Sequence, residues 1–365
     1  MKKIIVLALV LTYCLVIVQA KADFVFGEPE NLGPTINTPK HDWDQSVSLD
    51  GLSIGFARSE LNWSGYQMWV TDRPTVSDPW SDPVFLGEMN DYGAILKDLF
   101  DSKGFFLGTC TLDGLEAYVW EDFPGGYGGQ DIWVIKRDTV EADFGPPENI
   151  GQAVNSSSND YGYLISPDGL ALYFPSDRPE GYGRTDLYVT TRAKREDPWG
   201  IAVNLGAHIN SPDTDYNPHV TYDGLLLLFV SNRPGGFGAK DIWMTRRASI
   251  TDPWEQAVNL GPMVNTSVDD DVPFISPDGS ILYFSSSRPG GYGGEDLWYV
   301  PIIPIVDLNG DGIVDAADMC IIVDNWGTDN QLCDIGPMPW GDGIVDVEDL
   351  IVIAGHLFEE TTPVE

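Results

Sequence analysis

The sequence predicts an all-β propeller of five four-stranded blades, followed by a small acidic module with short helices. The main observation is a repeat of about 55 residues, a period typical of propellers and solenoids. Each repeat has a Leu-Gly or Ile-Gly step, an Asp-Gly turn and short β-rich runs without helical periodicity. The steps begin at Leu32, Leu86, Ile150, Leu205 and Leu260, and the turns begin at Asp50, Asp113, Asp168, Asp223 and Asp278.

The first 22 residues have the pattern of an export signal. Lys2 and Lys3 precede an apolar run over residues 4–18, and Ala20 and Ala22 supply the small residues at a cleavage site. A membrane anchor is the alternative, but the run is shorter than the roughly 20 residues that a spanning helix needs. We therefore expect a secreted, extracellular protein with no membrane span after the signal is cleaved.

The mature chain is strongly acidic. Of 20 Lys and Arg residues, three lie in the signal, which leaves 17 against 56 Asp and Glu and a net charge of −39. Nucleic acid is thereby excluded as a partner, whereas cations are favoured. Residues 304–365 contain no Lys or Arg at all. The remaining cysteines, Cys110, Cys320 and Cys333, are too few for a disulfide scaffold, although the last two could pair.

Residues 23–303 are assigned to the propeller, and their ends predict how it closes. An aromatic residue stands six positions before every Leu-Gly step, but no such segment follows the fifth repeat. An orphan copy, residues 26–33, lies instead near the mature N-terminus. We expect this N-terminal strand to complete the last blade, which would remove an exposed sheet edge.

Two of the turns carry a family signature. Residues 166–169 and 276–279 both read Ser-Pro-Asp-Gly and lead into Leu-Tyr-Phe-like strands, whereas the first two repeats lack the proline. By these residues the propeller region resembles the WD-type, TolB-like (PD-repeat) β-propeller family. The resemblance implies the fold, and the family's functions are diverse.

Residues 304–365 are assigned to a second module, which begins with a calcium-binding loop over residues 307–318. Its oxygen ligands fall at loop positions 1, 3, 5, 9 and 12, a glycine occupies position 6, and a carbonyl is available at position 7. These residues are Asp307, Asn309, Asp311, Gly312, Ile313, Asp315 and Asp318. Pro301 and Pro304 prevent a helix before the loop, so only an exiting helix over about 316–326 is expected.

A second, irregular copy follows, with a helix expected to end near His356. Its candidate ligands are Asp334, Asp342, Ile344, Asp346 and Asp349, on an enlarged loop without a clear ligand at position 3. Paired EF-hand-like loops that have only exiting helices resemble the type I dockerin module. The resemblance implies two Ca²⁺ ions and a cohesin-like partner on a scaffold or cell surface. Positions 10 and 11, often Ser or Thr in dockerins, are here Ala316, Ala317, Val347 and Glu348.

In the propeller, an acid recurs where each innermost strand should begin. We name these residues the ring acids; they are Asp42, Asp91, Asp160, Asp215 and Asp270. They could surround one mouth of the central channel and bind a cation, an amine or sugar hydroxyls. The alternative is a capped turn that recurs because the blade recurs, since Asp often bonds its own backbone at such points.

Two functions therefore remain open. The first is a binding or interaction protein, attached through the calcium module and presenting its propeller to a polysaccharide or protein. The second is a glycoside-active enzyme, hydrolase or lyase, whose site lies in the channel and uses paired carboxylates. The first is favoured because five near-equivalent Asp residues offer no acid distinct from a base. Glu116 and the insertion at 93–103 are the repeat-breaking candidates.

Overall fold

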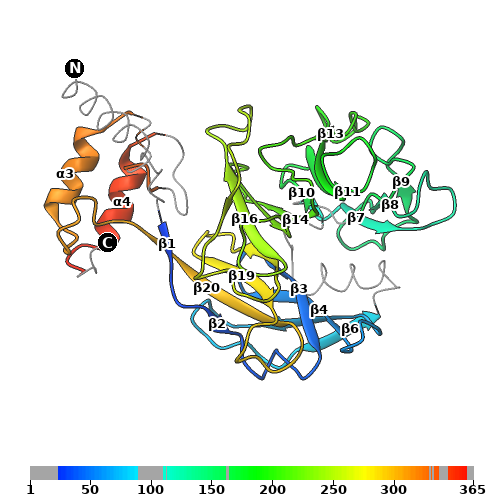
Figure 1. The fold of residues 1–365 in the computed structure, drawn as a ribbon, viewed down its shortest axis with the longest axis horizontal. Coiled ribbons are helices and arrows are strands. Elements are labelled where there is room, and N and C mark those ends of the chain that lie inside the picture. The colour runs from blue at the N-terminus through cyan, green and yellow to red at the C-terminus, as the bar shows by residue number, and fades with distance from the viewer. Residues whose placement is uncertain are drawn as a thin grey trace, which may run out of the picture. The chain divides into compact units, whose positions relative to one another are not determined.

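The structure, a computed structural model, describes residues 24–88, 110–111, 113–161, 164–328, 330, 333–336 and 344–359. The export signal, the insertion at 93–103, Asp91 and Asp342 lie outside these residues. The chain divides into two compact units, one spanning Phe26–Ile302 and the other containing the residues from Ile303 onward. Figure 1 follows the chain through both.

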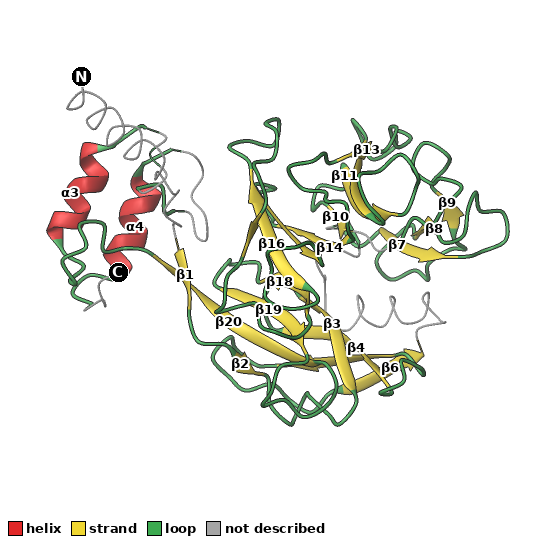
Figure 2. Cartoon of the chain, viewed as in Figure 1, coloured by secondary structure: helices red, strands yellow, loops and turns green. Residues whose placement is uncertain are grey.

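The first unit is a five-bladed β-propeller built from antiparallel sheets (Figure 2). Blade 1 contains β3 (His41–Val47), β4 (Ser53–Ser59), β5 (Gln67–Asp72) and β6 (Val84–Glu88); blade 2 contains β7 (Glu116–Glu121), β8 (Asp131–Lys136) and β9 (Glu148–Asn149). Blade 3 contains β10 (Leu164–Ile165), β11 (Ala171–Ser176), β12 (Asp186–Thr191) and β13 (Val203–Asn204); blade 4 contains β14 (Asp215–Val220), β15 (Leu226–Ser231), β16 (Asp241–Arg246) and β17 (Val258–Asn259). Blade 5 contains β18 (Asp270–Ile275), β19 (Ile281–Ser286) and β20 (Asp296–Pro304).

Blade 2 shows three strands among the described residues. The segment where its innermost strand is expected is mostly outside them, but Cys110 forms a β-bridge with Ala117 of β7. That bridge lies where the innermost strand should run. The sequence-based prediction of five blades is thus confirmed.

The N-terminal segment completes blade 5, as expected. β1 (Phe24–Phe26) and β2 (Glu30–Asn31) both belong to the sheet of β20, and Asn31 of β2 lies opposite Trp298. A buried amide reinforces the junction, because the Asn37 side chain accepts from the Leu297 N–H and donates to the Leu297 carbonyl, at 2.8 and 2.9 Å. β18 also packs against β3 of blade 1 and β14 of blade 4, so the last blade joins the first.

The repeated sequence motifs correspond to repeated contacts. In blade 5, the Asp278 carboxylate accepts hydrogen bonds from the Ser276 hydroxyl and the Ser280 N–H, while Gly279 takes a φ of +72° that favours glycine. The second strand of a blade then buries a large aromatic side chain at its fourth position. These fully buried residues are Phe56, Phe174, Phe229 and Phe284. Each turn therefore sets the register of a strand that fills the core.

The second unit contains two nine-residue helices among its described residues, α3 (Ala316–Asp324) and α4 (Val347–Gly355). α3 ends before the predicted position, with its C-cap at Asn325, whereas α4 ends as predicted, with its C-cap at His356. The core consists of aliphatic residues and one cysteine: Val306, Val314, Ile322, Cys333, Ile335, Val345 and Ile353. Cys320 is exposed while Cys333 is buried, and the two do not pair. Within the described residues, no helix has the length and apolarity to cross a membrane.

The second unit contains two loop–helix copies, and each copy pairs through backbone hydrogen bonds with the segment that follows the helix of the other. Val314, before α3, exchanges backbone hydrogen bonds with Phe358 and Glu359, which follow α4. Val345, before α4, exchanges the equivalent bonds with Gly327 and Thr328, which follow α3. Each loop is therefore held by the segment that leaves the other helix.

Candidate functional site

The four ring acids that the structure describes are fully buried at the starts of their blades. One carboxylate oxygen of each accepts from an arginine of the same blade at 2.5–2.7 Å, and the other accepts from a backbone N–H four residues earlier. The arginine pairs are Asp42–Arg58, Asp160–Arg178, Asp215–Arg233 and Asp270–Arg288, and the N–H donors are Thr38, Ser156, Ser211 and Thr266. This is the geometry that the repeated-turn alternative expects, while a ligand role for the ring acids stays a prediction.

The ring-acid arginines also organise the blade. Arg288 lies over the Trp298 ring at 5.2 Å and over the Phe284 ring at 4.6 Å. Its counterparts lie over Trp69, Tyr188 and Trp243 in blades 1, 3 and 4. Cation–π contact and the buried ion pair together fix the start of each innermost strand against the third strand.

The residues beside the ring acids change from blade to blade, and several of them meet at one point. We name this set the mouth cluster; it consists of Asp44, Tyr216, Asn217, Lys240, Asp269, Asp271 and Glu295. Lys240 and Glu295 occupy the same position in the repeat, directly before the first Asp of the third strand. Their carbonyls accept from the N–H groups of Asp270 and Asp42 in the next blade. The backbone at this position is thus fixed, while its side chain varies.

Asp271 is the centre of the mouth cluster. Its carboxylate accepts hydrogen bonds from the Tyr216 hydroxyl at 2.9 Å, the Asn217 amide at 2.8 Å and the Lys240 ammonium at 2.8 Å. Burial, followed by the charge of Asp271, raises the pKa of Tyr216 well above its ordinary value. The phenol therefore keeps its proton and acts as a donor. Three donors from blade 4 thus hold one carboxylate of blade 5.

Two further carboxyl groups are affected by the charge of Asp271. Burial, and then the Asp271 charge, raises the pKa of Glu295 to about 7. Asp44 is an exposed residue, although many protein atoms lie around its carboxylate; desolvation by these atoms, followed by the Asp271 charge, raises the pKa of Asp44 to about 6. Carboxyl groups whose pKa values are raised and separated are the usual acid and base of an active site.

The backbone is strained at the same place. Asp44, Asn217 and Val272 occupy equivalent positions, two residues after their ring acids, with φ of 55°, 49° and 47°. The strand pairing is irregular there in blades 1, 4 and 5. A β-branched residue such as Val272 at positive φ is a genuine outlier, and such strain concentrates at functional sites. At these bulges the side chains do not alternate between the two faces of the sheet as they do in a regular strand.

An unsatisfied polar group marks the cluster as well. Gln45 is buried, and its amide nitrogen donates to the Val272 carbonyl at 2.5 Å. Its Oε1 has no hydrogen-bond partner among the residues that the structure describes. A buried acceptor without a partner has a cost of about 1–3 kcal/mol, which a ligand hydroxyl or water would relieve.

Aromatic side chains of blade 1 lie beside this cluster. Trp63 stacks on His41 with ring centroids 3.8 Å apart, and Trp43 contacts both Trp63 and Tyr66 edge-to-face. The His41 ring accepts the Glu295 N–H at 3.0 Å. The aromatic group and the acid group are thereby joined through one imidazole.

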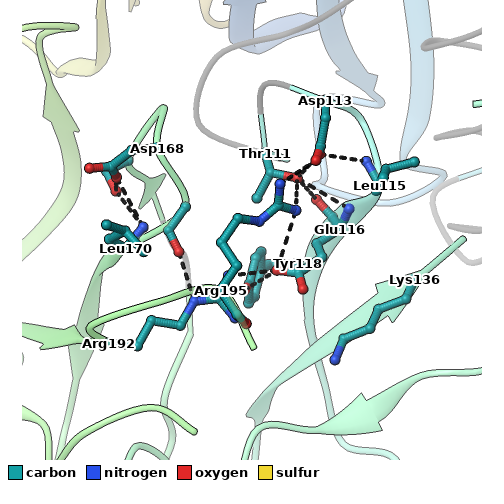
Figure 3. A network of polar contacts seen from close by, with 12 residues as sticks. Thr111, Asp113, Leu115, Glu116, Tyr118, Lys136, Asp168, Leu170, Arg192 and Arg195 are labelled. Carbon is teal, nitrogen blue, oxygen red and sulfur yellow. Dashed lines mark hydrogen bonds and ion pairs between the residues drawn. The ribbon is translucent and has the colours of Figure 1, made fainter. Parts of the chain in front are cut away.

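Glu116 lies elsewhere, in a pocket of about 700 Å³ between blades 2 and 3. Figure 3 shows its carboxylate among Arg192, Arg195 and Tyr118. Arg192 donates to Glu116 at 2.6 Å, and the Tyr118 hydroxyl donates at 3.2 Å. The other repeats have no glutamate at this position, so the ion pair is particular to this blade junction. A carboxylate paired in this way is better suited to joining blades than to proton transfer.

The first predicted calcium loop is folded around its first residue. The Asp307 carboxylate accepts from the N–H groups of Gly310, Asp311 and Gly312. Asp318 accepts from the N–H groups of Leu308 and Asn309 with one oxygen and of Asp315 with the other. Asp311 and Asp315 also accept backbone N–H groups within the loop. The donor set has the hard oxygens that Ca²⁺ prefers.

The second loop has matching anchors. Asp349 accepts from the N–H groups of Ile335 and Gly336 with one oxygen and of Asp346 with the other. These bonds correspond to those of Asp318, which makes Asp334 the counterpart of Asp307. Ile344 and Asp346 are described at the end of the loop, and Asp342 is not. Across the described residues, no three His, Cys, Asp or Glu side chains converge as a group that could hold a metal ion.

Sequence reasoning missed Asp44 and Glu295 and identified the ring acids instead. The ring acids recur in register, and recurrence identifies what builds the blade. The useful signal was a position of the repeat at which the residue type changes from blade to blade. At the position of Glu295 the other repeats have Gln130, Thr185 and Lys240. Asp271 was visible only as the acid beside Asp270.

No family model matches the chain, and no curated protein matches it. Solved structures with similar folds include the catalytic domain of a Coprinopsis cinerea GH62 α-L-arabinofuranosidase, at 11% identity and a TM-score of 0.47, covering 78% of this chain and 98% of that one. A B. megaterium levansucrase variant has 10% identity and a TM-score of 0.46, covering 79% and 90%. A Lactobacillus brevis α-L-arabinofuranosidase has 13% identity and a TM-score of 0.42, covering 74% and 92%. At these TM-scores the likenesses carry no argument about chemistry.

Proposed function

We propose that the mouth cluster is a glycoside-active site, which makes the propeller an enzyme acting on extracellular polysaccharide. The carrying observation is that Asp44 and Glu295, with pKa values raised to about 6 and about 7, both respond to the charge of Asp271. Cleavage of a glycosidic bond requires one carboxyl group that donates a proton and one that accepts a proton or attacks. The five equivalent ring acids could not provide this difference, but the mouth cluster does.

The roles follow from these values. Between pH 6 and 7, Glu295 carries its proton more often than Asp44 does. Glu295 then donates a proton to the leaving oxygen, and Asp44 acts as the carboxylate. Asp271 is a positioning residue, which raises both pKa values and is itself held by Lys240 and Tyr216. We expect kcat/KM to follow a bell-shaped pH profile with limbs near these two pKa values.

The test is product release from a panel of plant and algal polysaccharides. Glu295→Gln and Asp44→Asn should each lower kcat/KM about 100-fold or more. Asp271→Asn should move both limbs of the pH profile to lower pH, which a merely structural residue would not do. Glu116→Gln is the matched control and should keep its turnover. Absence of turnover on every substrate, or full activity of Glu295→Gln, would refute the proposal.

A second candidate function is favoured by the loop around Asp307. We propose that residues 307–318 bind Ca²⁺, that the loop from Asp334 to Asp349 binds a second ion more weakly, and that the loaded module attaches the propeller to a cohesin-like domain on a scaffold or cell surface. The wrapping of three N–H groups onto the Asp307 carboxylate supports the proposal. Bound Ca²⁺ would neutralise acids that repel one another in the unfolded loop, and so would favour the folded module.

This attachment is tested on the full mature chain by calcium titration calorimetry after chelator treatment. Asp307→Asn should remove the tighter site, whereas Asp324→Asn, an exposed acid on α3 outside the loop, should leave it intact. Retention on an immobilised type I cohesin domain should require Ca²⁺. Calcium binding that is insensitive to Asp307→Asn would contradict the loop assignment, and calcium-independent retention would contradict its role in attachment.

A further inference from the structure

The loop between the second and third strands of blade 1 differs from its counterparts. In the other blades this loop reads Pro-Gly-Gly-Tyr-Gly or a close variant, whereas blade 1 has Glu60-Leu61-Asn62-Trp63-Ser64-Gly65. The Trp63 N–H donates to the Glu60 carbonyl, and the Glu60 N–H donates to the Ser64 carbonyl. Lys40 also pairs with the Glu60 carboxylate at 2.6 Å. The substituted loop is therefore a closed, anchored turn.

The turn holds Trp63 in a strained conformation. Its φ is +57°, in a region that bulky residues rarely adopt, and 41% of its surface is nonetheless exposed. A tryptophan that only filled space would be buried, and a turn that only reversed the chain would use glycine or asparagine here. Strain combined with exposure indicates a side chain that is kept for contact with something outside the chain.

Trp63 is also rigidly supported. The interplanar angle to the buried His41 ring is 21°, and His41 is fixed by the Glu295 N–H on one nitrogen and by the Leu61 carbonyl, at 3.4 Å, on the other. Trp43 packs against Trp63 with ring centroids 5.7 Å apart and ring planes at 80°. Tyr66, which is 39% exposed, also packs against Trp43, with ring centroids 6.2 Å apart. His41 therefore stacks on the indole, while 41% of the Trp63 surface stays exposed to solvent.

We propose that Trp63, with Trp43 and Tyr66, forms a stacking shelf for a sugar ring of the glycan that enters the mouth cluster, and that this glycan lacks carboxylate and sulfate groups. The shelf is connected to the acids through His41 and Glu295, so a ring stacked on Trp63 would belong to the chain that Glu295 and Asp44 cleave. This inference rests on the proposed function and names its substrate class.

The stacking follows from the chemistry of both partners. One face of a pyranose presents C–H groups, and the face of an indole is electron-rich, so the two attract and exclude water between them. Binding sites for small ligands combine such aromatic walls with a few fixed polar groups. The unpartnered Gln45 Oε1 is one such polar group, available to a sugar hydroxyl.

The exclusion of acidic glycans follows from charge. The one ammonium of the mouth cluster, that of Lys240, already contacts the Asp271 carboxylate at 2.8 Å and the Asp269 carboxylate at 3.7 Å. A uronate or sulfate would meet like charges without a free cation among the described residues of the mouth cluster. Like charges in a confined site disfavour binding strongly.

The test separates binding from turnover. Wild type and Glu295→Gln are run in affinity electrophoresis against neutral polysaccharides, including xylan, arabinan, mannan and β-glucan, and against pectate, alginate and a sulfated galactan. The neutral glycan retained most strongly is then titrated calorimetrically as an oligosaccharide into Glu295→Gln, so that no turnover disturbs the measurement.

In that background Trp63→Ala should weaken binding about tenfold or more, and Trp63→Phe should weaken it less. Tyr182→Ala removes an aromatic ring from the corresponding loop of blade 3 that is 55% exposed, and it should leave binding unchanged. An unchanged thermal midpoint would show that Trp63→Ala still folds.

The results also separate this inference from the proposed function. Retention of no neutral polysaccharide, tighter binding of an acidic one, or equal binding by Trp63→Ala would overturn the shelf. Turnover with an unaltered KM in Trp63→Ala would also overturn the shelf while leaving the reaction intact. Binding that depends on Trp63 without any turnover in wild type would instead refute the reaction and support the shelf.

Discussion

The Arg288 guanidinium donates to the Asp270 carboxylate at 2.7 Å, and both side chains are buried at the start of blade 5. The same carboxylate accepts the Ser286 hydroxyl and the Thr266 N–H, so its charge is compensated on every side. A buried pair of this kind adds little net stability over an apolar pair, yet breaking it leaves an uncompensated charge. The repetition of this pair in four blades makes it a fixed point of the fold.

Asp270→Asn should therefore lower the free energy of unfolding by about 3 kcal/mol or more, because Arg288 would remain buried without its counter-charge. Chemical denaturation measures the change. Glu60→Gln, which removes the exposed ion pair with Lys40, is the control and should cost less than about 1 kcal/mol. Equal costs for the two variants would show that Asp270 has no structural role of this kind.

Glu295→Gln should stabilise the protein at high pH. The pKa of this group rises from 4.5 to about 7 on folding, so the folded state binds more protons between these values and stability falls as pH rises through them. Because glutamine does not titrate, the variant does not lose this stability as pH rises. We expect it to be more stable than wild type by on the order of 2 kcal/mol at pH 8 and by little at pH 4.5. A difference that does not change with pH would contradict the pKa shift.

His219 should make the propeller sensitive to acid. Burial lowers the pKa of His219 to about 3, and its neutral Nε2 accepts the Ile275 N–H at 3.1 Å between blades 4 and 5. The stability that depends on the neutral ring is complete above pH 6.5 and is lost as pH falls toward 3.

His219→Gln keeps an acceptor at the same place but cannot be protonated there. It should equal wild type near pH 7 and exceed it by on the order of 2–3 kcal/mol at pH 4. Thermal unfolding across this range measures the difference. His208→Gln, at a less buried histidine, serves as the comparison and should show no such trend; a similar trend in it would count against a specific role for His219.

Gly294→Ala should disturb the aromatic shelf by displacing the His41 ring, on which Trp63 stacks. A Cβ at this position would lie 2.4 Å from the His41 ring, although the backbone of Gly294 does not have a positive φ. His41 must then move, which removes the acceptor of the Glu295 N–H and the support of Trp63. We expect a loss of about 1–3 kcal/mol in chemical denaturation, together with weaker glycan binding. Gly355→Ala, which meets no atom within 4 Å, should be neutral.

The fold was predictable because its signals are repeated. The Asp-Gly turns identify a contact that the structure repeats, and the orphan copy at residues 26–33 supplies the strand that completes the last blade. The end of α3 was predicted less accurately, because Gly327 leaves the helical region at positive φ to pair with the opposite loop. Pairing between two copies is not visible in either copy alone.

The mouth cluster was not predictable in the same way. Asp44, Lys240 and Glu295 belong to three different blades, and only closure of the ring brings them to Asp271. Their chemistry depends on burial and on mutual charge, neither of which a residue pattern contains. Residues that change at fixed repeat positions were the available signal, and Tyr66 and Glu295 share one such position.

The pairing of β2 with β20 also sets an order of events when the chain is made. The ribosome delivers β1 and β2 first among the strands of blade 5 and residues 296–304 last, so β2 must wait for nearly the whole propeller before its partner exists. During that interval β2 lacks its partner strand. Premature termination anywhere before β20 would release a ring that no remaining strand can close, and quality control by proteases would act on that open form.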